Sequence, residues 1–358
     1  MKVAVIPSDT GACGHFRLVW PAEAVRSVRP DWQVDIYHPK AVQIAAGPKG
    51  LAVRGLDLEG LDLAVFQRIG TTRQVELVRA VQAAGIAVAI DVDDALYCID
   101  PDSGSYAAWN GRHSPTHWSN LEEATRRADL VTVTTDALAL HYAKHSRVER
   151  IVNGLPEFAY QDEPPVRVGE PVTVGWSGVA ASHAHDLEVV GPALAKIMAD
   201  SPDVYLRVVG DAQWAAGVLQ VPEDRLIDAG LHPLSGYHAA LRGTDVGIVP
   251  LEDTPFNRAK SALKALEFTA AGAHVVASPT PANAELAITT HMSLAKTPDG
   301  WEHALRQSLA AVRYYREYGG LGVVDVRHMG ILPRAEEWAQ AWERAINRRK
   351  NLTTKKRR

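Results

Sequence analysis

Hydrophobic residues along the chain gather in short runs of strand length, and stretches with helical spacing separate these runs. In the first half the runs are residues 3–6, 33–37, 63–66, 86–90, 130–133 and 148–152. Residues 73–84 have the 3.6-residue period of a helix, and Gly85 stands where that helix should end. Strands that are apolar throughout and alternate with helices are typical of βαβ units around a parallel sheet.

The same alternation resumes in the second half, with apolar runs at residues 172–176, 204–209, 225–227, 246–249 and 274–277. Between the halves, residues 157–171 are rich in proline and charge and lack any period, which is typical of an interdomain linker. We therefore expect an α/β fold with two Rossmann-like, doubly wound parallel-sheet domains, residues 1–156 and 172–333. The carboxyl ends of both sheets should face a common cleft, and ligands should bind there.

A last helical pattern occupies residues 334–350, where one apolar stripe should pack against a domain, and residues 351–358 should form a disordered basic tail. The last eleven residues hold seven basic and no acidic side chains, whereas the remaining 347 residues carry 31 basic and 42 acidic ones, a net charge of −11. This balance argues against a protein that wraps nucleic acid over a wide face. It leaves the tail as a tether to phosphate or to an anionic membrane.

The 358 residues, 46% of them hydrophobic, fit a globular protein of two domains. Two cysteines, Cys13 and Cys98, cannot build a disulfide framework or a thiolate metal cage, so no metal is expected. The chain has no run of 18 apolar residues, and the N-terminal run ends at Pro7, too early for a signal peptide. We expect a cytoplasmic protein without a transmembrane segment.

The segment with the clearest chemical content is residues 250–272, which follows an apolar run and ends in glycine. Read as one helix, it places four polar side chains on one face: Asn257, Lys260, Lys264 and Glu267. Lysines near a helix start add to the free amides and the dipole there, so this face would bind a phosphate or diphosphate. Glu267 would accept from vicinal hydroxyls such as those of a ribose. An ordinary solvated face with a Lys264–Glu267 pair is the alternative.

Residues 267–278, Glu-Phe-Thr-Ala-Ala-Gly-Ala-His-Val-Val-Ala-Ser, resemble part of the Glu-(seven residues)-Glu element of the large retaining, glycogen-synthase-like family of GT-B glycosyltransferases. Asn-Gly-Leu-Pro at residues 153–156 and Val-Gly-Trp-Ser-Gly at residues 174–178 are similar to that family's turn before the linker and its first strand of the second domain. In that family the first glutamate contacts the transferred sugar. Ala259 stands at its position here, so Asn257 or Lys260 would have to make the contact instead. The combination of Lys260-Ser261 with Lys264 resembles enzymes of phage and bacterial clusters.

The resemblance implies a metal-independent, retaining transfer of a hexosyl or pentosyl group from a UDP-, GDP- or ADP-sugar to an acceptor hydroxyl. The nucleotide sugar would be a co-substrate, with no permanently bound cofactor. Donor binding would fall to Asn257, Lys260, Ser261, Lys264, Glu267, Ser177, Gly178, Gly210 and Asp211. A modified base of phage DNA, a protein and a glycan are the acceptors left open. A phage-encoded enzyme would act in the host cytoplasm.

Residues 8–17, Ser-Asp-Thr-Gly-Ala-Cys-Gly-His-Phe-Arg, form a glycine-containing turn between a strand and a helix. Gly11 and Gly14 would let backbone amides approach a ligand closely, although a tight turn without a ligand explains them equally well. In the family that the chain resembles, this loop lies under the donor phosphates and the acceptor. His15 is therefore a catalytic candidate and Arg17 an acceptor-side candidate, as is His117 in a later polar and aromatic loop.

Three carboxylates, Asp91, Asp93 and Asp94, end an apolar strand and should point towards the cleft. In the glycosyltransferase interpretation Asp91 faces the acceptor, and Asp93 or Asp94 orients a hydroxyl or acts as the base, with Glu267 as a further catalytic candidate. An apolar strand ending in Asp-x-Asp also begins the magnesium-dependent haloacid-dehalogenase-like phosphatases, but Asp94 replaces their glycine and this strand comes fourth. A non-catalytic protein that binds nucleotide sugars or nucleic acid is the remaining alternative.

Overall fold

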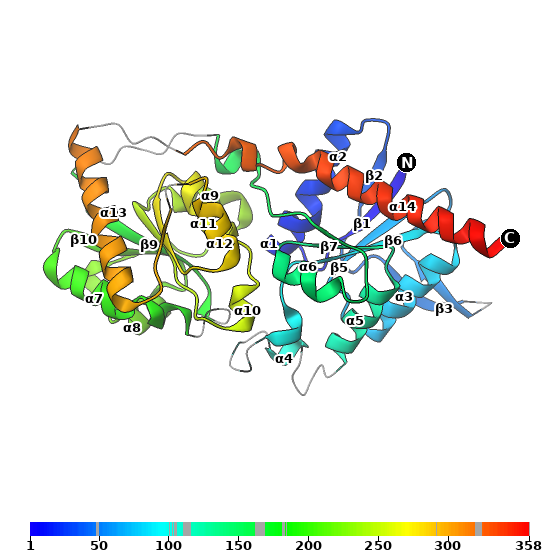
Figure 1. Ribbon diagram of the computed structural model, residues 1–358, viewed down its shortest axis with the longest axis horizontal. Helices are drawn as coiled ribbons and strands as arrows, with labels where there is room; N and C mark the ends of the chain where they lie inside the picture. Colours follow the sequence, from blue (N-terminus) through cyan, green and yellow to red (C-terminus); the bar gives the residue numbers. More distant parts are fainter. Residues whose placement is uncertain are drawn as a thin grey trace. The chain divides into compact units, whose positions relative to one another are not determined.

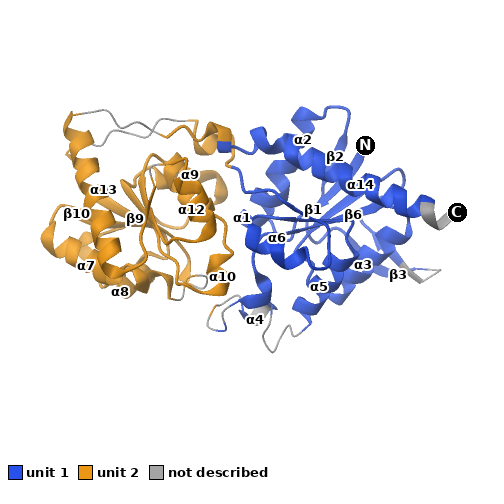
Figure 2. Cartoon of the chain, viewed as in Figure 1, with its two compact units in different colours: residues 1–101, 106–154, 329–358 blue, residues 102–105, 155–328 orange. Residues whose placement is uncertain are grey.

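The computed structural model of the chain describes residues 1–47, 50–99, 101, 103, 106–109, 116–161, 169–180, 183, 185–290, 292–318 and 324–357. The chain divides into two compact units (Figure 2). Unit 1 consists of residues 1–101, 106–154 and 329–358, and unit 2 of residues 102–105 and 155–328. Unit 1 therefore takes its last segment from the far end of the sequence. The expected linker, residues 157–171, falls in unit 2, and residues 162–168 of it lie outside the described part.

Unit 1 is built on a six-stranded parallel sheet in the order β2-β1-β5-β6-β7-β8 (Figure 1). Its strands are β1 Lys2–Ile6, β2 Gln33–Ile36, β5 Leu63–Gln67, β6 Ala87–Val92, β7 Leu130–Val133 and β8 Val148–Arg150. Every residue of β5 and β6 is buried, as expected for central strands covered on both faces. The antiparallel pair of β3 (Gln43–Gly47) and β4 (Gly50–Arg54) was not expected from the sequence.

Helices cover both faces of this sheet (Figure 1). On one face, α2 (Trp20–Val28) and α14 (Ala335–Arg357) share a core with β1, β5 and β6. On the other, α3 (Thr72–Ala83) packs on β6 and beside α5 (His117–Arg127). The shorter helical segments are α1 Ala12–Gly14, the π-helical η1 His15–Val19, η2 Leu96–Cys98, α4 Tyr106–Trp109 and α6 Asp136–Tyr142. Gly85, with φ of 85°, follows α3 where the pattern places its end.

The last helix, α14, belongs to unit 1. Trp338, Ala341, Trp342 and Ile346, the stripe seen in the sequence, are all buried in the core of that unit. The helix runs to Arg357, so residues 351–357 are helical where a disordered tail was expected. Thr353 and Thr354 donate to the carbonyls four residues before them over 2.9 Å, and most of the neighbouring residues are good helix formers. Helix propensity therefore continues α14 past its last buried residue, which an apolar stripe alone does not predict.

Unit 2 repeats the plan with a parallel sheet in the order β11-β10-β9-β12-β13-β14. Its strands are β9 Val172–Gly178, β10 Val204–Gly210, β11 Leu226–Asp228, β12 Val246–Val249, β13 His274–Ala277 and β14 Met292–Leu294, of which only β14 was not predicted. Helices α7 Gly191–Asp200, α8 Ala212–Leu219 and α13 Pro298–Tyr318 share one core cluster, whereas α9 Leu234–Leu241 and α11 Leu263–Ala270 share another. The predicted class, two Rossmann-like parallel-sheet domains, is confirmed.

The strand order reverses once in each unit, and this decides where a ligand should bind. In unit 2 the chain leaves β9 towards β10 and β11, then returns to the other side of β9 at β12. In unit 1 the corresponding reversal lies between β1 and β5. Open α/β sheets bind ligands outside the carboxyl ends of the strands at such a reversal. In the ranges that the structure describes, no helix has the length and apolar composition needed to cross a membrane.

Candidate functional site

The carboxyl end of β9 carries Ser177, and side chains from two helices gather around its hydroxyl. Tyr237 of α9 places its Oη 2.8 Å from Ser177 Oγ, and the Lys264 ammonium of α11 donates to both, over 2.6 Å to the phenol and 3.3 Å to the serine. Glu267, one turn after Lys264, accepts from Tyr237 at 3.2 Å and lies 3.7 Å from the ammonium. We call these four residues the Lys264 cluster. They lie at the strand-order reversal of unit 2.

The charges of the Lys264 cluster follow from its contacts. Burial would raise the pKa of Glu267, but Lys264 and a hydrogen bond from His238 outweigh it and lower that pKa. Burial would lower the pKa of Lys264, but Tyr237 and Glu267 hold it above its ordinary value. Burial and Glu267 raise the pKa of the Tyr237 phenol to about 12. The side chain of Glu267 is 3% exposed and that of Lys264 38%, so the carboxylate is enclosed while part of the lysine side chain reaches solvent.

The segment of residues 250–272 is not one helix, and the shared polar face expected for it was wrong. Helix α10 (Pro255–Arg258) ends after one turn, and α11 begins at Leu263. Lys260 and Ser261 lie in the turn between them. The side-chain amide of Asn257 donates to Asp186 at 2.8 Å and to the carbonyl of Glu252 at 3.1 Å, which ties α10 to a neighbouring loop. Such tertiary contacts override a helical period.

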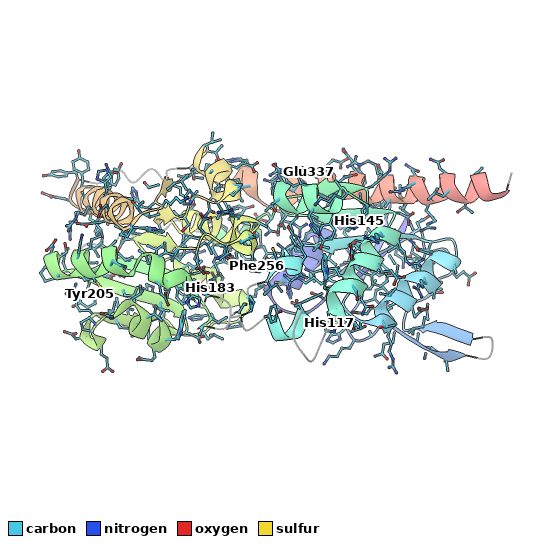
Figure 3. The ribbon with its side chains drawn as sticks, turned by 60° about the horizontal axis from the view of Figure 1, so that its bottom comes forward. His117, His145, His183, Tyr205, Phe256 and Glu337 are labelled. Carbon is cyan, nitrogen blue, oxygen red and sulfur yellow. The ribbon has the colours of Figure 1, made fainter. Side chains whose placement is uncertain are left out.

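Asn257 thus fixes a neighbouring loop from a buried position instead of contacting the nucleotide-sugar donor. Asn257 holds Asp186, the first residue of η5 (Asp186–Val189), and the Asp186 carboxylate accepts several hydrogen bonds. Oδ1 accepts from the side chain of Asn257 and, at 2.9 Å, from the amide of Glu252. Oδ2 lies 2.8 Å from His183 Nδ1 and 3.8 Å from the ammonium of Lys260. The ring of Phe256 lies 5.2 Å from that ammonium, and Figure 3 labels both Phe256 and His183.

The turns after β9 and β10 touch through their backbones. Gly210 has φ of 138°, and a Cβ there would lie 1.9 Å from the carbonyl oxygen of Gly178. The amide of Asp211 donates to that carbonyl at 3.1 Å, and its carboxylate accepts from the amide of Ala180 at 2.7 Å. Gly178, Gly210 and Asp211, all predicted to bind the donor, are thus brought together beside Ser177. Asp211 uses its carboxylate to fix the β9 turn.

In unit 1 the turn after β1 is closed by its own carboxylate. Asp9 Oδ1 accepts from the amides of Gly11, at 2.8 Å, and Gly14, at 3.2 Å. A Cβ on Gly14 would lie 2.1 Å from the carbonyl oxygen of Asp9, so the close approach that requires glycine is to this turn itself. The expectation that these two amides face a ligand is corrected, because Asp9 takes the place of the anion. His15 is partly buried, and its Nδ1 lies 2.8 Å from the carbonyl of Gly11.

Arg17 and Asp91, both expected on the acceptor side, form a buried ion pair instead. Their side chains are 1% and 0% exposed, and the guanidinium donates to both carboxylate oxygens at 3.1 and 2.7 Å. It also donates to the carbonyl of Ile151 at 2.7 Å and lies 4.9 Å from the ring of Trp338. Burial raises the pKa of Asp91 while Arg17 opposes that rise. A carboxylate held in this way cannot serve as the nucleophile of the phosphatase alternative.

Asp93 and Asp94 lie at the end of β6, and both are bound by Arg68, which the sequence reasoning missed. Arg68 donates to Asp93 at 2.5 and 2.7 Å and to Asp94 at 2.7 Å. The exposed fractions of the three side chains are 15%, 10% and 31%, so Asp94 is the most accessible. Burial would lower the pKa of Arg68, but the two carboxylates raise it well above its ordinary value. The only signal for Arg68 in the sequence was its place directly after an apolar strand.

The other predicted and missed residues are more dispersed. His117, labelled in Figure 3, begins α5 and contacts the ring of Trp109 edge to face, 5.6 Å between centroids, so the structure places it in an aromatic contact. Tyr237, which completes the Lys264 cluster, lies on a different helix from Lys264 and has no marking sequence pattern. Among the residues that the structure describes, no three His, Cys, Asp or Glu side chains are grouped as a metal site would need.

Comparison with known proteins identifies the fold. No family model matches the chain, and no curated protein matches it. A solved structure described as trehalose-6-phosphate from E. coli bound with UDP-2-fluoro glucose aligns over 96% of this chain and 99% of its own, with a TM-score of 0.60 and 11% identity. An α,α-trehalose-phosphate synthase (UDP-forming) from Burkholderia vietnamiensis aligns over 97% and 99%, with a TM-score of 0.57 and 12% identity. The pneumococcal O-GlcNAc transferase GtfA in complex with UDP and GlcNAc aligns over 87% and 66%, with a TM-score of 0.51 and 11% identity.

These neighbours are GT-B proteins, and the chain shares their two-domain α/β fold. At 11% to 12% identity the likeness shows the fold alone. The function must be argued from the side chains described above.

Proposed function

We propose that the chain is a glycosyltransferase that moves a sugar from a nucleotide-sugar donor to an acceptor hydroxyl. The observation that carries the proposal is the Lys264 cluster, an ammonium held in place by Ser177, Tyr237 and Glu267 at the strand-order reversal of unit 2. The presence of UDP or a UDP sugar in two of the similar solved structures supports the nucleotide-sugar class.

In this proposal Lys264 binds the donor diphosphate and stabilises it as it leaves. Lys264 lies in the first turn of α11, where the helix dipole disfavours a cation and favours an anion. A bound diphosphate would therefore interact favourably with the ammonium and with the free amides together. Glu267, at 3% exposure, acts through Lys264 and Tyr237 and does not meet the ribose, which departs from the sequence-based expectation. Lys260 and Ser261 flank the same site.

The acceptor hydroxyl is proposed to meet Asp93 or Asp94 in unit 1, where Arg68 holds both carboxylates in position. Retention of configuration and independence of metal remain predictions from the family resemblance. A modified base of phage DNA also remains a prediction, with protein and glycan as the other acceptor classes.

The first test is thermal shift against UDP, GDP, ADP and their glucose conjugates. Wild-type protein is expected to gain several degrees with one nucleotide, because a ligand that binds only the folded state stabilises it. Lys264→Ala should lose that gain. Lys196→Ala is the matched control, since Lys196 is 60% exposed, pairs with Glu302 of α13 at 3.0 Å and should leave the gain intact. No gain with any nucleotide would overturn the proposal.

Turnover separates an enzyme from a binding protein. Release of free nucleotide from the bound sugar donor is measured with oligosaccharide, peptide and hydroxymethylated DNA acceptors, with and without EDTA. Release that depends on one acceptor and survives EDTA is expected, and proton NMR of the product would give the anomeric configuration. Binding of the donor without release on any acceptor would favour the non-catalytic alternative.

A further inference from the structure

The loop after β9 carries two histidine–carboxylate pairs with the same spacing but different surroundings. His183 Nδ1 lies 2.8 Å from Asp186 Oδ2, and His185 Nδ1 lies 3.2 Å from Glu188 Oε1. The exposed fractions are 16% and 5% in the first pair, against 44% and 63% in the second. The second pair is an ordinary surface contact, whereas the first is built into unit 2.

Asp186 holds the His183 ring in one orientation. Its other oxygen is fixed by the amide of Glu252 and the side chain of Asn257, at 2.9 and 2.8 Å, so the carboxylate itself cannot rotate. The pKa of Asp186 is lowered: burial opposes this, but His183 and Lys260 outweigh it, so the carboxylate is ionised and only accepts. Nδ1 must therefore carry the proton that it shares, and the lone pair of a neutral ring lies on Nε2. In the described part of the chain, Nε2 has no hydrogen-bond partner.

The ring lies at the same strand end as the Lys264 cluster. The Cδ2 of His183 would be 2.9 Å from a Cβ on Gly178, the residue after Ser177. The His183 and Trp176 rings pack edge to face, with 5.6 Å between their centroids. Gly178 thus leaves space for the rings of both Trp176 and His183. Lys264 lies close enough to lower the pKa of His183, and Lys260 lies 3.8 Å from the carboxylate that holds the ring, so a ligand bound to Lys264 comes within reach of this ring.

The charged groups that face His183 come from three elements: Asp186 on η5, Lys260 in the turn before α11, and Lys264 on α11. Burial lowers the pKa of His183 and both lysines add to that effect, against the hydrogen bond and charge of Asp186. The ring is thus neutral at pH 7 while no anion is bound. The positive charges of Lys264 and Lys260 are already paired with the carboxylates of Glu267 and Asp186. A bound diphosphate would therefore add negative charge that these two pairs do not neutralise.

We propose that His183 is a ligand of the donor diphosphate and that it takes up one proton from solvent when the diphosphate binds. This deepens the proposed function and rests on it. The proton joins Nε2, and the resulting N–H donates to a phosphate oxygen while Nδ1 keeps its bond to Asp186. No covalent bond of the donor forms or breaks in this step. The proton returns to solvent when the nucleotide leaves.

The experiment is calorimetric titration with UDP-glucose, GDP-glucose and ADP-glucose between pH 6 and 8. A nucleotide sugar has no phosphomonoester group, so its phosphates stay ionised over this range and only protein groups titrate. Repeating the titration in buffers of different ionisation enthalpy counts the protons taken up. Wild-type protein should take up a proton around pH 7, and its affinity should fall as the pH rises.

His183→Gln should remove the proton uptake and weaken binding at pH 6.5 about tenfold, the effect of losing one charge-assisted hydrogen bond. His185→Gln is the matched control from the same loop and should behave as wild type. Asp186→Asn, which frees the ring, should also lose the pH dependence. Binding with the same proton uptake in wild type and His183→Gln would overturn this inference and leave the transferase proposal standing. Failure of wild type to bind any of the three probes would overturn the proposed function itself.

Discussion

Arg68 and Asp93 are joined by hydrogen bonds of 2.5 and 2.7 Å, and Arg68 makes them from a left-handed backbone conformation with φ of 48°. That region costs a residue with a side chain on the order of 1 kcal/mol, and such strain persists only where the surroundings impose it. The same guanidinium reaches Asp94. The two carboxylates proposed to meet the acceptor are thus located by one strained residue on the neighbouring strand end.

Arg68→Ala should destabilise unit 1 by about 3 kcal/mol at pH 7, because it leaves two largely buried carboxylates side by side without a cation. Urea unfolding at pH 7 measures this. Arg79→Ala is the control, since Arg79 pairs with Glu76 and Glu123 on the surface and should show little change. A loss for Arg68→Ala no larger than that for Arg79→Ala would contradict the account.

Glu267→Gln should reduce the stability of unit 2 at neutral pH by about 2 kcal/mol, because it removes the buried partner of Lys264. The pKa of Glu267 in the folded protein is lower than the ordinary 4.5, so ionisation adds stability above that pH. The difference between wild type and Glu267→Gln should therefore be full at pH 7 and vanish as the pH falls through the folded pKa, below 4.5. Melting temperatures from pH 3 to 7 test this, with Glu188→Gln, whose side chain is 63% exposed in the same unit, as the control. A constant difference would refute it.

Gly210→Ala should weaken nucleotide binding at least tenfold and lower the melting temperature of unit 2. Its Cβ would lie 1.9 Å from the carbonyl oxygen of Gly178 and would need φ near 138°, so the two turns beside Ser177 must separate. Gly217→Ala on α8 has open space around its Cβ and should be neutral or slightly stabilising. Thermal shift with the bound nucleotide compares the two variants. Wild-type binding by Gly210→Ala would show that the turns are not part of the site.

Arg17→Met and Asp91→Asn should each cost about 3 to 5 kcal/mol, because each leaves a fully buried charge without its partner. The double variant should cost less than the sum of the single ones, since no unpaired charge remains. A double-mutant cycle in urea measures the coupling. Additive losses would mean that the two side chains act independently, contrary to their two hydrogen bonds.

The fold could be predicted from the sequence because its strands are buried on both faces. Residues 87–90 of β6 and all of β12 are apolar, and they stand out against the helical period between the strands. The hairpin of β3 and β4 was missed because its apolar runs, residues 44–46 and 51–53, are only three residues long and polar or glycine residues flank them. The segment that forms α10 and α11 was read as one helix because its period does not reveal the bonds that Asn257 makes to Asp186.

The site could be predicted only as far as single residues at strand ends. Ser177, Lys264 and Glu267 meet as a group because Ser177 lies at the end of β9 while Lys264 and Glu267 follow β12, the strand beside it. Their partner Tyr237 comes from α9, and Arg68 comes from the strand beside β6, so long-range contacts decided both. The burial of Arg17 and Asp91 likewise depends on α14, more than 200 residues away in sequence.

The packing of α14 on unit 1 also has a consequence for biosynthesis. Trp338 and Trp342 fill the face formed by β1, β5 and β6, yet the ribosome makes them after all of unit 2. At roughly 5–20 residues per second, the nascent first unit waits about 10 to 35 s for the helix that completes this core beside α2. The main segment of unit 2, residues 155–328, is continuous in sequence and can fold during that interval. We expect the order of maturation to be the reverse of the order of synthesis, with chaperones holding the earlier-made sheet until the last helix is released.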